Sequence, residues 1–113
     1  MAARRLDYVM TLRIKGEEVF FGPGVVTVME KIEQTGSLSK AAKQMGMSYN
    51  KAWRILQRAE KNWGQPLVET NIGGASGGGT QLTAEGRKLV ATYMGFRQEA
   101  EAVVAELFQK YFG

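Results

Sequence analysis

Cysteine and histidine are both missing from the 113 residues of this chain. The absence of cysteine excludes disulfide bonds and thiolate metal ligands, and the absence of histidine removes the commonest transition-metal ligand and general base. An enzyme built from this chain would depend on carboxylates, lysines or hydroxyls, and no paired carboxylates have a spacing that would converge on a cleft. We therefore expect neither an enzyme nor a metal or cofactor site.

Long apolar runs are missing as well, since no stretch approaches the roughly 20 residues needed to span a bilayer. The opening segment, MAARRLDYVM, carries basic side chains but lacks the apolar core of a secretory signal. We accordingly expect a cytoplasmic protein without a membrane partner. The apolar share of 44% and the charged share of 23% are ordinary for a folded chain, so we expect a single domain over residues 1–113.

Positive charge is concentrated in residues 36–61, which have the sequence GSLSKAAKQMGMSYNKAWRILQRAEK. This stretch holds six basic residues and one acid, Glu60, and so carries a net charge of +5, whereas the whole chain carries +4. Its pattern predicts two short helices joined by a tight turn. A helix pair of this shape and charge is what a DNA major groove accepts.

The residues before this stretch predict a β-hairpin followed by a helix. Apolar side chains alternate between Tyr8 and Lys15 with the period of two that is typical of a half-covered strand, and residues 19–21 predict the return strand. The hairpin would thus span residues 8–21. The next apolar residues have helical spacing until Gly36, and they are Val25, Val28, Met29 and Ile32.

Two further helices are expected in the basic stretch, which gives three helices over residues 25–63. Ser37 is the expected cap of the first of the two, whose inward residues are Leu38, Ala41, Ala42 and Met45. Ser48 is the expected cap of the second, whose inward residues are Ala52, Leu56, Ala59 and Trp63. The residues that recur every four positions on its opposite side are Asn50, Arg54 and Arg58. Trp53 belongs cleanly to neither side.

Two short strands that flank a glycine-rich loop follow these helices, over residues 67–82. A strand, a glycine-rich tip and a strand directly after such a helix predict the wing of a winged helix-turn-helix. We do not expect this loop to bind a nucleotide, because no Gly-Lys-Ser/Thr sequence follows it. A long last helix is expected over residues 84–112, with Thr83 as its cap.

The apolar residues of the last helix are spaced by four and three, as in a heptad seam. We expect a homodimer contact, because the seam is longer than a small domain needs and DNA half-sites usually require two modules; an intramolecular core is the alternative. The seam consists of Leu89, Tyr93, Phe96, Ala100, Val103 and Leu107. The expected fold class is mainly α with small β: a winged helix-turn-helix with an N-terminal β-hairpin and a long C-terminal dimerisation helix.

Most of the residues best suited to DNA contacts lie at the starts of two helices and in the wing, and Lys43 and Arg58 would add charge close to the DNA backbone. The first turn of the third helix can reach base edges, since Asn pairs with adenine and Arg or Lys pairs with guanine, although a solvated basic face is the alternative. The start of the second helix suits a phosphate oxygen, but Ser37 is equally suited to capping alone. The glycines would let the wing backbone approach DNA, or would form only a flexible tip. The candidate DNA-binding residues are Ser37, Ser39, Lys40, Lys43, Ser48, Tyr49, Asn50, Lys51, Arg54, Arg58, Gly77 and Gly78.

The chain contains the segments GSLSKAAKQMGMSYNKAW, LVET with the glycine-rich loop after it, and LTAEGRKL. Over about residues 20–95, these segments resemble the N-terminal winged helix-turn-helix domain of ModE-type, molybdate-responsive regulators, and more distantly the LysR-type DNA-binding domain. The resemblance implies that the helix beginning at Ser48 enters the major groove, that the wing lies by the DNA backbone and that the domain dimerises. Regulators of that family often carry molybdate-binding domains after this module, and a ligand response, if there is one, is not visible in the present sequence.

We therefore predict a sequence-specific, double-stranded DNA-binding transcriptional regulator that acts as a homodimer. One alternative is a protein-interaction module that no longer reads DNA, and the concentrated basic face argues against it. The other is a molybdate- or oxyanion-linked regulatory module, which only the resemblance suggests. The sequence does not determine the operator, the sign of regulation, the role of the N-terminal hairpin, or whether a separate effector or molybdate-binding protein is a partner.

Overall fold

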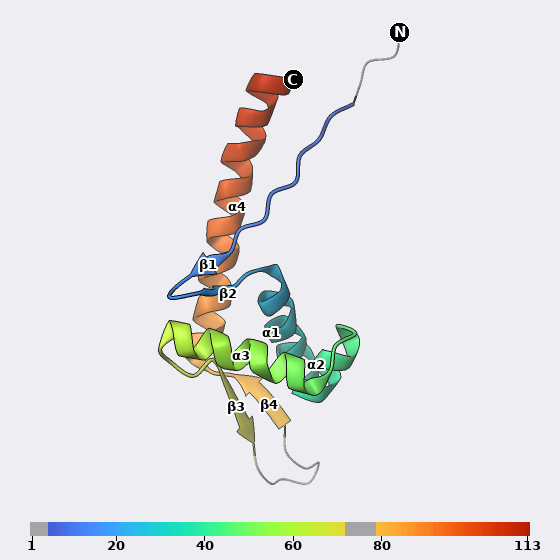
Figure 1. Cartoon of the computed structure of the whole chain (residues 1–113), viewed down its shortest axis with the longest axis vertical. Coiled ribbons are helices and arrows are strands. Elements are labelled where there is room, and N and C mark those ends of the chain that lie inside the picture. The colour runs from blue at the N-terminus through green and yellow to red at the C-terminus, as the bar shows by residue number, and fades with distance from the viewer. Residues whose placement is uncertain (1–4, 72–78) are drawn as a thin grey trace.

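A computed structural model describes residues 5–71 and 79–113. The elements follow in the order β1 (Ile14–Lys15), β2 (Val19–Phe21), α1 (Pro23–Thr35), α2 (Leu38–Gln44), α3 (Tyr49–Trp63), β3 (Val68–Asn71), β4 (Gly79–Leu82) and α4 (Ala84–Phe112). In Figure 1, the strands β3 and β4 (the wing) and the helix α4 extend from the α1–α3 body in opposite directions. The molecule is accordingly long, with extents of 65 × 30 × 21 Å. This architecture confirms the expected mainly helical fold with small β-hairpins and a long C-terminal helix.

The ends of the helices follow local chemistry. The hydroxyl oxygens of Ser37, Ser48 and Thr83 accept hydrogen bonds from the backbone N–H groups three residues later, at 3.1, 3.1 and 2.9 Å. These are the three expected caps, and they begin α2, α3 and α4. Gly36 and Gly46 lie in the left-handed region, with φ of 70° and 67°, where other residues are strained. The caps and glycines together fix the short turns on both sides of α2.

The core lies between the three helices of the body, β2, the wing and the start of α4. Small buried residues on α2 and α3, such as Ala41 and Ala52 at 0% exposure, let these helices approach closely. Helix α1 begins earlier than expected, at Pro23; Val26 is buried, and Val25 is partly buried against the core. The inward assignment of Trp63 is wrong. Trp63 is 37% exposed at the end of α3, where its Nε1 donates to Glu85 Oε1 at 3.0 Å.

The N-terminal segment differs from the expected long hairpin. Only Ile14–Lys15 pairs with Val19–Phe21, whereas residues 5–13 (the N-terminal arm) are extended and run beside α4 (Figure 1). The predicted alternation is present, since the even-numbered residues 8 to 14 are half-buried and their odd-numbered neighbours are exposed. The face is covered by a helix: Tyr8 lies 4.9 Å from Phe108 between ring centroids. The period of two therefore predicted a half-covered extended chain correctly. The expected strand from residue 8 does not form over its whole length, because β2 has only three residues to pair with it.

The long helix α4 requires a correction to the expected dimer seam. Leu89 and Tyr93 are only 4% and 2% exposed, and the Tyr93 ring packs edge-on against Phe21 at 5.4 Å between centroids. These two residues belong to the core of their own domain and leave no surface for a partner. Phe96, Val103 and Leu107 are exposed, and Ala100 is half-buried.

Over the described parts of the chain, no helix is both long and apolar enough to cross a membrane.

Candidate nucleic-acid interface

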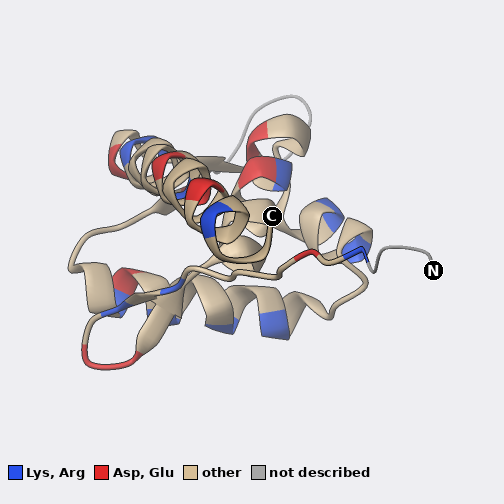
Figure 2. Ribbon diagram, turned by 90° about the horizontal axis from the view of Figure 1, so that it is seen from above, with Lys and Arg blue, Asp and Glu red and all other residues tan. Residues whose placement is uncertain are grey.

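Helix α3 has two faces of opposite chemistry. Its inward residues Ala52, Leu56 and Ala59 are 0% exposed. Its exposed basic residues recur at helical spacing on the other side, and we call them the cationic face: Lys51, Arg54, Arg58 and Lys61. Figure 2 shows the basic positions of α3 along the outer edge of the helix, with the acidic turn of the β1–β2 hairpin beside one end. The cationic face is therefore displayed to solvent by a helix whose opposite face is fixed in the core.

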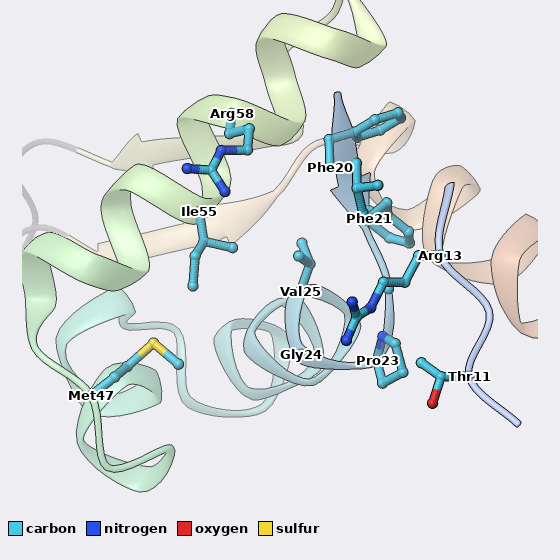
Figure 3. A pocket seen from close by; sticks show the side chains of 12 residues that line it. Thr11, Arg13, Phe20, Phe21, Pro23, Gly24, Val25, Met47, Ile55 and Arg58 are labelled. Carbon is cyan, nitrogen blue, oxygen red and sulfur yellow. The ribbon is translucent and has the colours of Figure 1, made fainter. Parts of the chain in front are cut away.

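Arg58 differs from the other members of this face because the hairpin engages it. Its Nε lies 3.0 Å from Glu18 Oε1 in the turn between β1 and β2. Figure 3 shows Arg58 and Ile55 on the α3 side of a groove of about 600 Å³, with Val25 and Arg13 among the residues that line it. Both charged side chains of the pair are more than half exposed, so the pair contributes little to stability. A phosphate oxygen could replace the Glu18 carboxylate without a large cost.

Helix α2 places further polar groups beside α3. Ser39 and Lys40 in its first turn and Lys43 in its last turn are exposed, as a phosphate contact requires. Ser37 is half-buried, and its oxygen accepts the backbone N–H of Lys40 in the cap. Capping uses the hydroxyl oxygen as an acceptor, so the hydroxyl proton of Ser37, and likewise that of Ser48, is still free to donate to a phosphate.

The wing is tied to α3 through Glu60, which sequence reasoning had noted only as the one acid of the basic stretch. Glu60 Oε2 accepts hydrogen bonds from the backbone N–H groups of Leu67 and Val68 at 2.8 and 3.2 Å. These donors lie at the base of β3, and charge-assisted bonds of this kind are stronger than neutral ones. The carboxylate therefore fixes the direction in which the wing leaves α3. A lone acid in a basic helix, eight residues before the first residue of β3, was the available signal.

The wing is also tied to the turn between α1 and α2. The backbone N–H of Thr80 in β4 donates to the carbonyl oxygen of Gly36 at 2.9 Å. A Cβ on Gly79 would lie 2.8 Å from the same oxygen, so this close approach requires glycine at position 79. Hydrogen bonds thus join the base of the wing both to the C-terminal part of α3 and to the turn before α2. The predicted contacts Gly77 and Gly78 lie outside the described residues.

Comparisons with known proteins agree with this geometry. The chain is 34% identical over 90 residues to the transcriptional regulator ModE of Haemophilus influenzae, a match that covers 80% of this chain and 35% of that protein. It is 36% identical over 85 residues to the molybdenum transport protein ModE of Azotobacter vinelandii, covering 75% and 32% of the two chains. The chain therefore spans about a third of the length of these relatives.

The fold has a counterpart among solved structures, the crystal structure of ArgP from Mycobacterium tuberculosis, with a TM-score of 0.54. The identity is 16%, and the match covers 75% of this chain and 30% of ArgP, so the likeness concerns the fold alone. Residues 26–87, more than half of the chain, match the family described as bacterial regulatory helix-turn-helix protein, lysR family. The chain belongs to this family of DNA-binding transcriptional regulators, which are not enzymes, and its relatives of ModE type extend over most of its length.

Proposed function

We propose that the chain is a sequence-specific, double-stranded DNA-binding module that works as a homodimer and inserts α3, from Ser48 onward, into the major groove. The cationic face of α3 carries this proposal, because it is exposed along a helix whose other face is completely buried. A solvated surface helix needs no such concentration of one charge. Duplex DNA provides the negative charge that complements this face and a major groove wide enough to accept the helix.

The proposed contacts divide by chemistry. Base edges are assigned to the exposed first turns of α3, which hold Tyr49, Asn50, Lys51 and Arg54. Phosphates are assigned to the start of α2, to Lys43 in its last turn, to the α3 cap Ser48 and to Arg58, because hydroxyls and point charges suit phosphate oxygens. The residues in this second group are Ser37, Ser39, Lys40, Lys43, Ser48 and Arg58. Gly77 and Gly78 are assigned to backbone contacts of the wing with DNA.

The exposed apolar side of α4 supports the homodimer. Phe96, Val103 and Leu107 are 50%, 57% and 47% exposed on one side of a helix that projects from the body (Figure 1). Contiguous apolar side chains of this kind are costly in water and mark contact surfaces. Because α4 and the wing extend in opposite directions, a contact between two copies through α4 would leave the wing end of each copy free to face DNA. A cytoplasmic location, with access to DNA, is part of the same proposal.

The proposal is tested by selecting bound sites from random duplexes and titrating the best one by fluorescence anisotropy. We expect Arg54→Ala to abolish the preference for the selected site over random duplex, because a bidentate guanine contact is lost. The matched control, Lys43→Ala, should weaken both duplexes equally and lower the slope of log affinity against log salt by about one unit. Normal binding of the best site by Arg54→Ala would show that the recognition helix is assigned wrongly.

The names of two relatives, molybdenum transport protein ModE and molybdenum-pterin-binding protein MopB, motivate a second candidate, an oxyanion-linked module. This chain matches only 32% and 30% of the lengths of those proteins. Equilibrium dialysis against molybdate distinguishes the two candidates, and we expect no retention by this chain. Retention on a duplex column at rising salt separates the DNA-binding module from a pure protein-interaction module.

A further inference from the structure

We infer that Trp53 is a further DNA-contacting residue, whose indole recognises thymine through the C5-methyl group in the major groove. This inference rests on the proposed function and extends it, because the candidate contacts described so far are polar or cationic groups, the Tyr49 hydroxyl among them, or wing backbone. It also assigns a role to the one aromatic residue of α3 that the sequence pattern placed on neither face.

Trp53 is exposed and unpartnered in a way that Trp63 is not. Its side chain is 41% exposed, and its Nε1 has no hydrogen-bond partner among the residues that the structure describes. Trp63, at the end of the same helix, donates its Nε1 to Glu85 at 3.0 Å. Tryptophan is the largest side chain and is usually covered, so leaving the Trp53 indole in water carries a cost that a partner would remove.

The position of Trp53 on α3 places it between the cationic face and the wing. Trp53 and Glu60 are seven residues apart, which is close to two turns, so both lie on one side of the helix. Glu60 bonds the first residues of β3, and this side therefore faces the base of the wing. Tyr49, one turn before Trp53 on the same side, is 52% exposed. Arg54 follows Trp53 directly on the cationic face. The indole thus borders the surface that is proposed to enter the groove.

The chemistry of the major groove restricts what an indole can contact there. The faces of the bases are stacked on one another in an intact duplex, and the edges in the major groove present mainly hydrogen-bonding groups, the largest apolar group among them being the C5-methyl of thymine. An apolar ring carried by a helix in the groove therefore gains most from a thymine methyl. Since the ring is uncharged, its contribution should affect sequence preference and leave the salt dependence unchanged.

The first experiment uses Trp63→Phe protein, in which Trp53 is the sole tryptophan. The probe is the best duplex selected from random sequences, labelled for anisotropy, so that duplex binding and Trp53 emission are followed in the same sample. We expect the emission to move to shorter wavelength on binding, as the indole loses contact with water. Binding seen by anisotropy without a change in emission would overturn the role of Trp53 and leave the proposed function standing. Absence of binding to any duplex would overturn both.

The second experiment replaces each thymine of the selected duplex by deoxyuridine, which removes only the methyl group. At one position we expect wild-type binding to weaken about fourfold, the effect of one buried methyl group. Trp53→Ala should bind the selected duplex about tenfold more weakly than wild type, with random duplex and the salt slope unchanged. Trp53→Phe, which keeps an aromatic ring, should stay within about threefold of wild type.

The two experiments converge in a thermodynamic cycle. The deoxyuridine effect should disappear in Trp53→Ala, because the methyl group then has no ring to contact. An equal loss in both proteins would assign the methyl contact to another residue and overturn the inference. The deoxyuridine series on wild-type protein does not depend on whether Trp53→Ala folds, and Trp53→Phe supplies a variant in which little packing is lost.

Discussion

The two halves of α4 share one heptad pattern and have different surroundings. In the half beside the body, Leu89 and Tyr93 are 4% and 2% exposed. In the projecting half, Phe96, Val103 and Leu107 are 50%, 57% and 47% exposed. Heptad spacing places all five side chains on one side of a helix and contains no information about what covers that side. The comparison shows that one amphipathic stripe can belong to the domain core in the N-terminal half of a helix and form an uncovered surface in the C-terminal half.

The projecting half is itself covered on one side only. The N-terminal arm lies beside it, with Tyr8 against Phe108 and with Met10 lining the same hollow as Ala102 and Ala105. The uncovered apolar residues lie on roughly the opposite side, where Phe96, Ala100 and Val103 line a shallow hollow. The arm therefore does not cover the exposed apolar residues of α4, and we propose that a second copy of the chain covers them.

The largest effect should come from the buried half. We expect Tyr93→Ala to lower the free energy of unfolding by about 4 kcal/mol, because it leaves a cavity beside Phe21 and removes the aromatic contact. Phe96→Ala, one turn further along the same stripe, is the matched control and should cost no more than about 1 kcal/mol in the monomer. Urea denaturation at low protein concentration measures both. Equal costs would contradict the division of α4 into a core half and a projecting half.

The projecting half of α4 should affect the association of two chains and not the stability of the single domain. We expect the double substitution Val103→Asp and Leu107→Asp to raise the dissociation constant of the homodimer by about 100-fold or more, because it places carboxylates in an apolar contact. Sedimentation equilibrium measures the constant. Gln109→Asp, on roughly the opposite side of α4, adds a charge to the same helix and should leave the constant unchanged.

Two different results would contradict the prediction that the projecting half of α4 forms the homodimer contact. Wild-type protein that sediments as a monomer at all concentrations would remove the homodimer from the proposal. A doubly substituted protein that dimerises as well as wild type would keep the homodimer and place its contact elsewhere on the chain.

Local signals made much of this fold predictable. The caps Ser37, Ser48 and Thr83 and the glycine-rich connection between two strands depend on residues close in sequence, and the structure contains the corresponding helices and hairpin. The partner of an extended face was not predictable in this way. The alternation from Tyr8 to Ile14 was correct, but only tertiary structure shows that α4 covers it.

The same division applies to the candidate site. The exposure of Lys51 and Arg54 opposite a buried face followed from helical spacing alone. The bonds from Glu60 to the base of the wing did not, because they depend on how the chain turns between α3 and β3. Trp63 was expected inside, yet it lies in the last turn of α3, where Glu85 of α4 offers a hydrogen bond at the surface. The assigned DNA contacts and the dimer contact remain predictions.

The smallest effect concerns the attachment of the N-terminal arm to α4. The Tyr93 hydroxyl donates to the Leu12 carbonyl oxygen at 2.9 Å, so Tyr93→Phe removes one hydrogen bond and keeps the ring against Phe21. We expect a loss of about 1 kcal/mol and faster amide hydrogen exchange in the arm. Tyr8→Phe is the control, because its hydroxyl has no partner in the described part of the chain and its ring can still contact Phe108. If both variants exchanged alike, the arm would be held by its apolar face, and the core half of α4 would contribute nothing to its attachment.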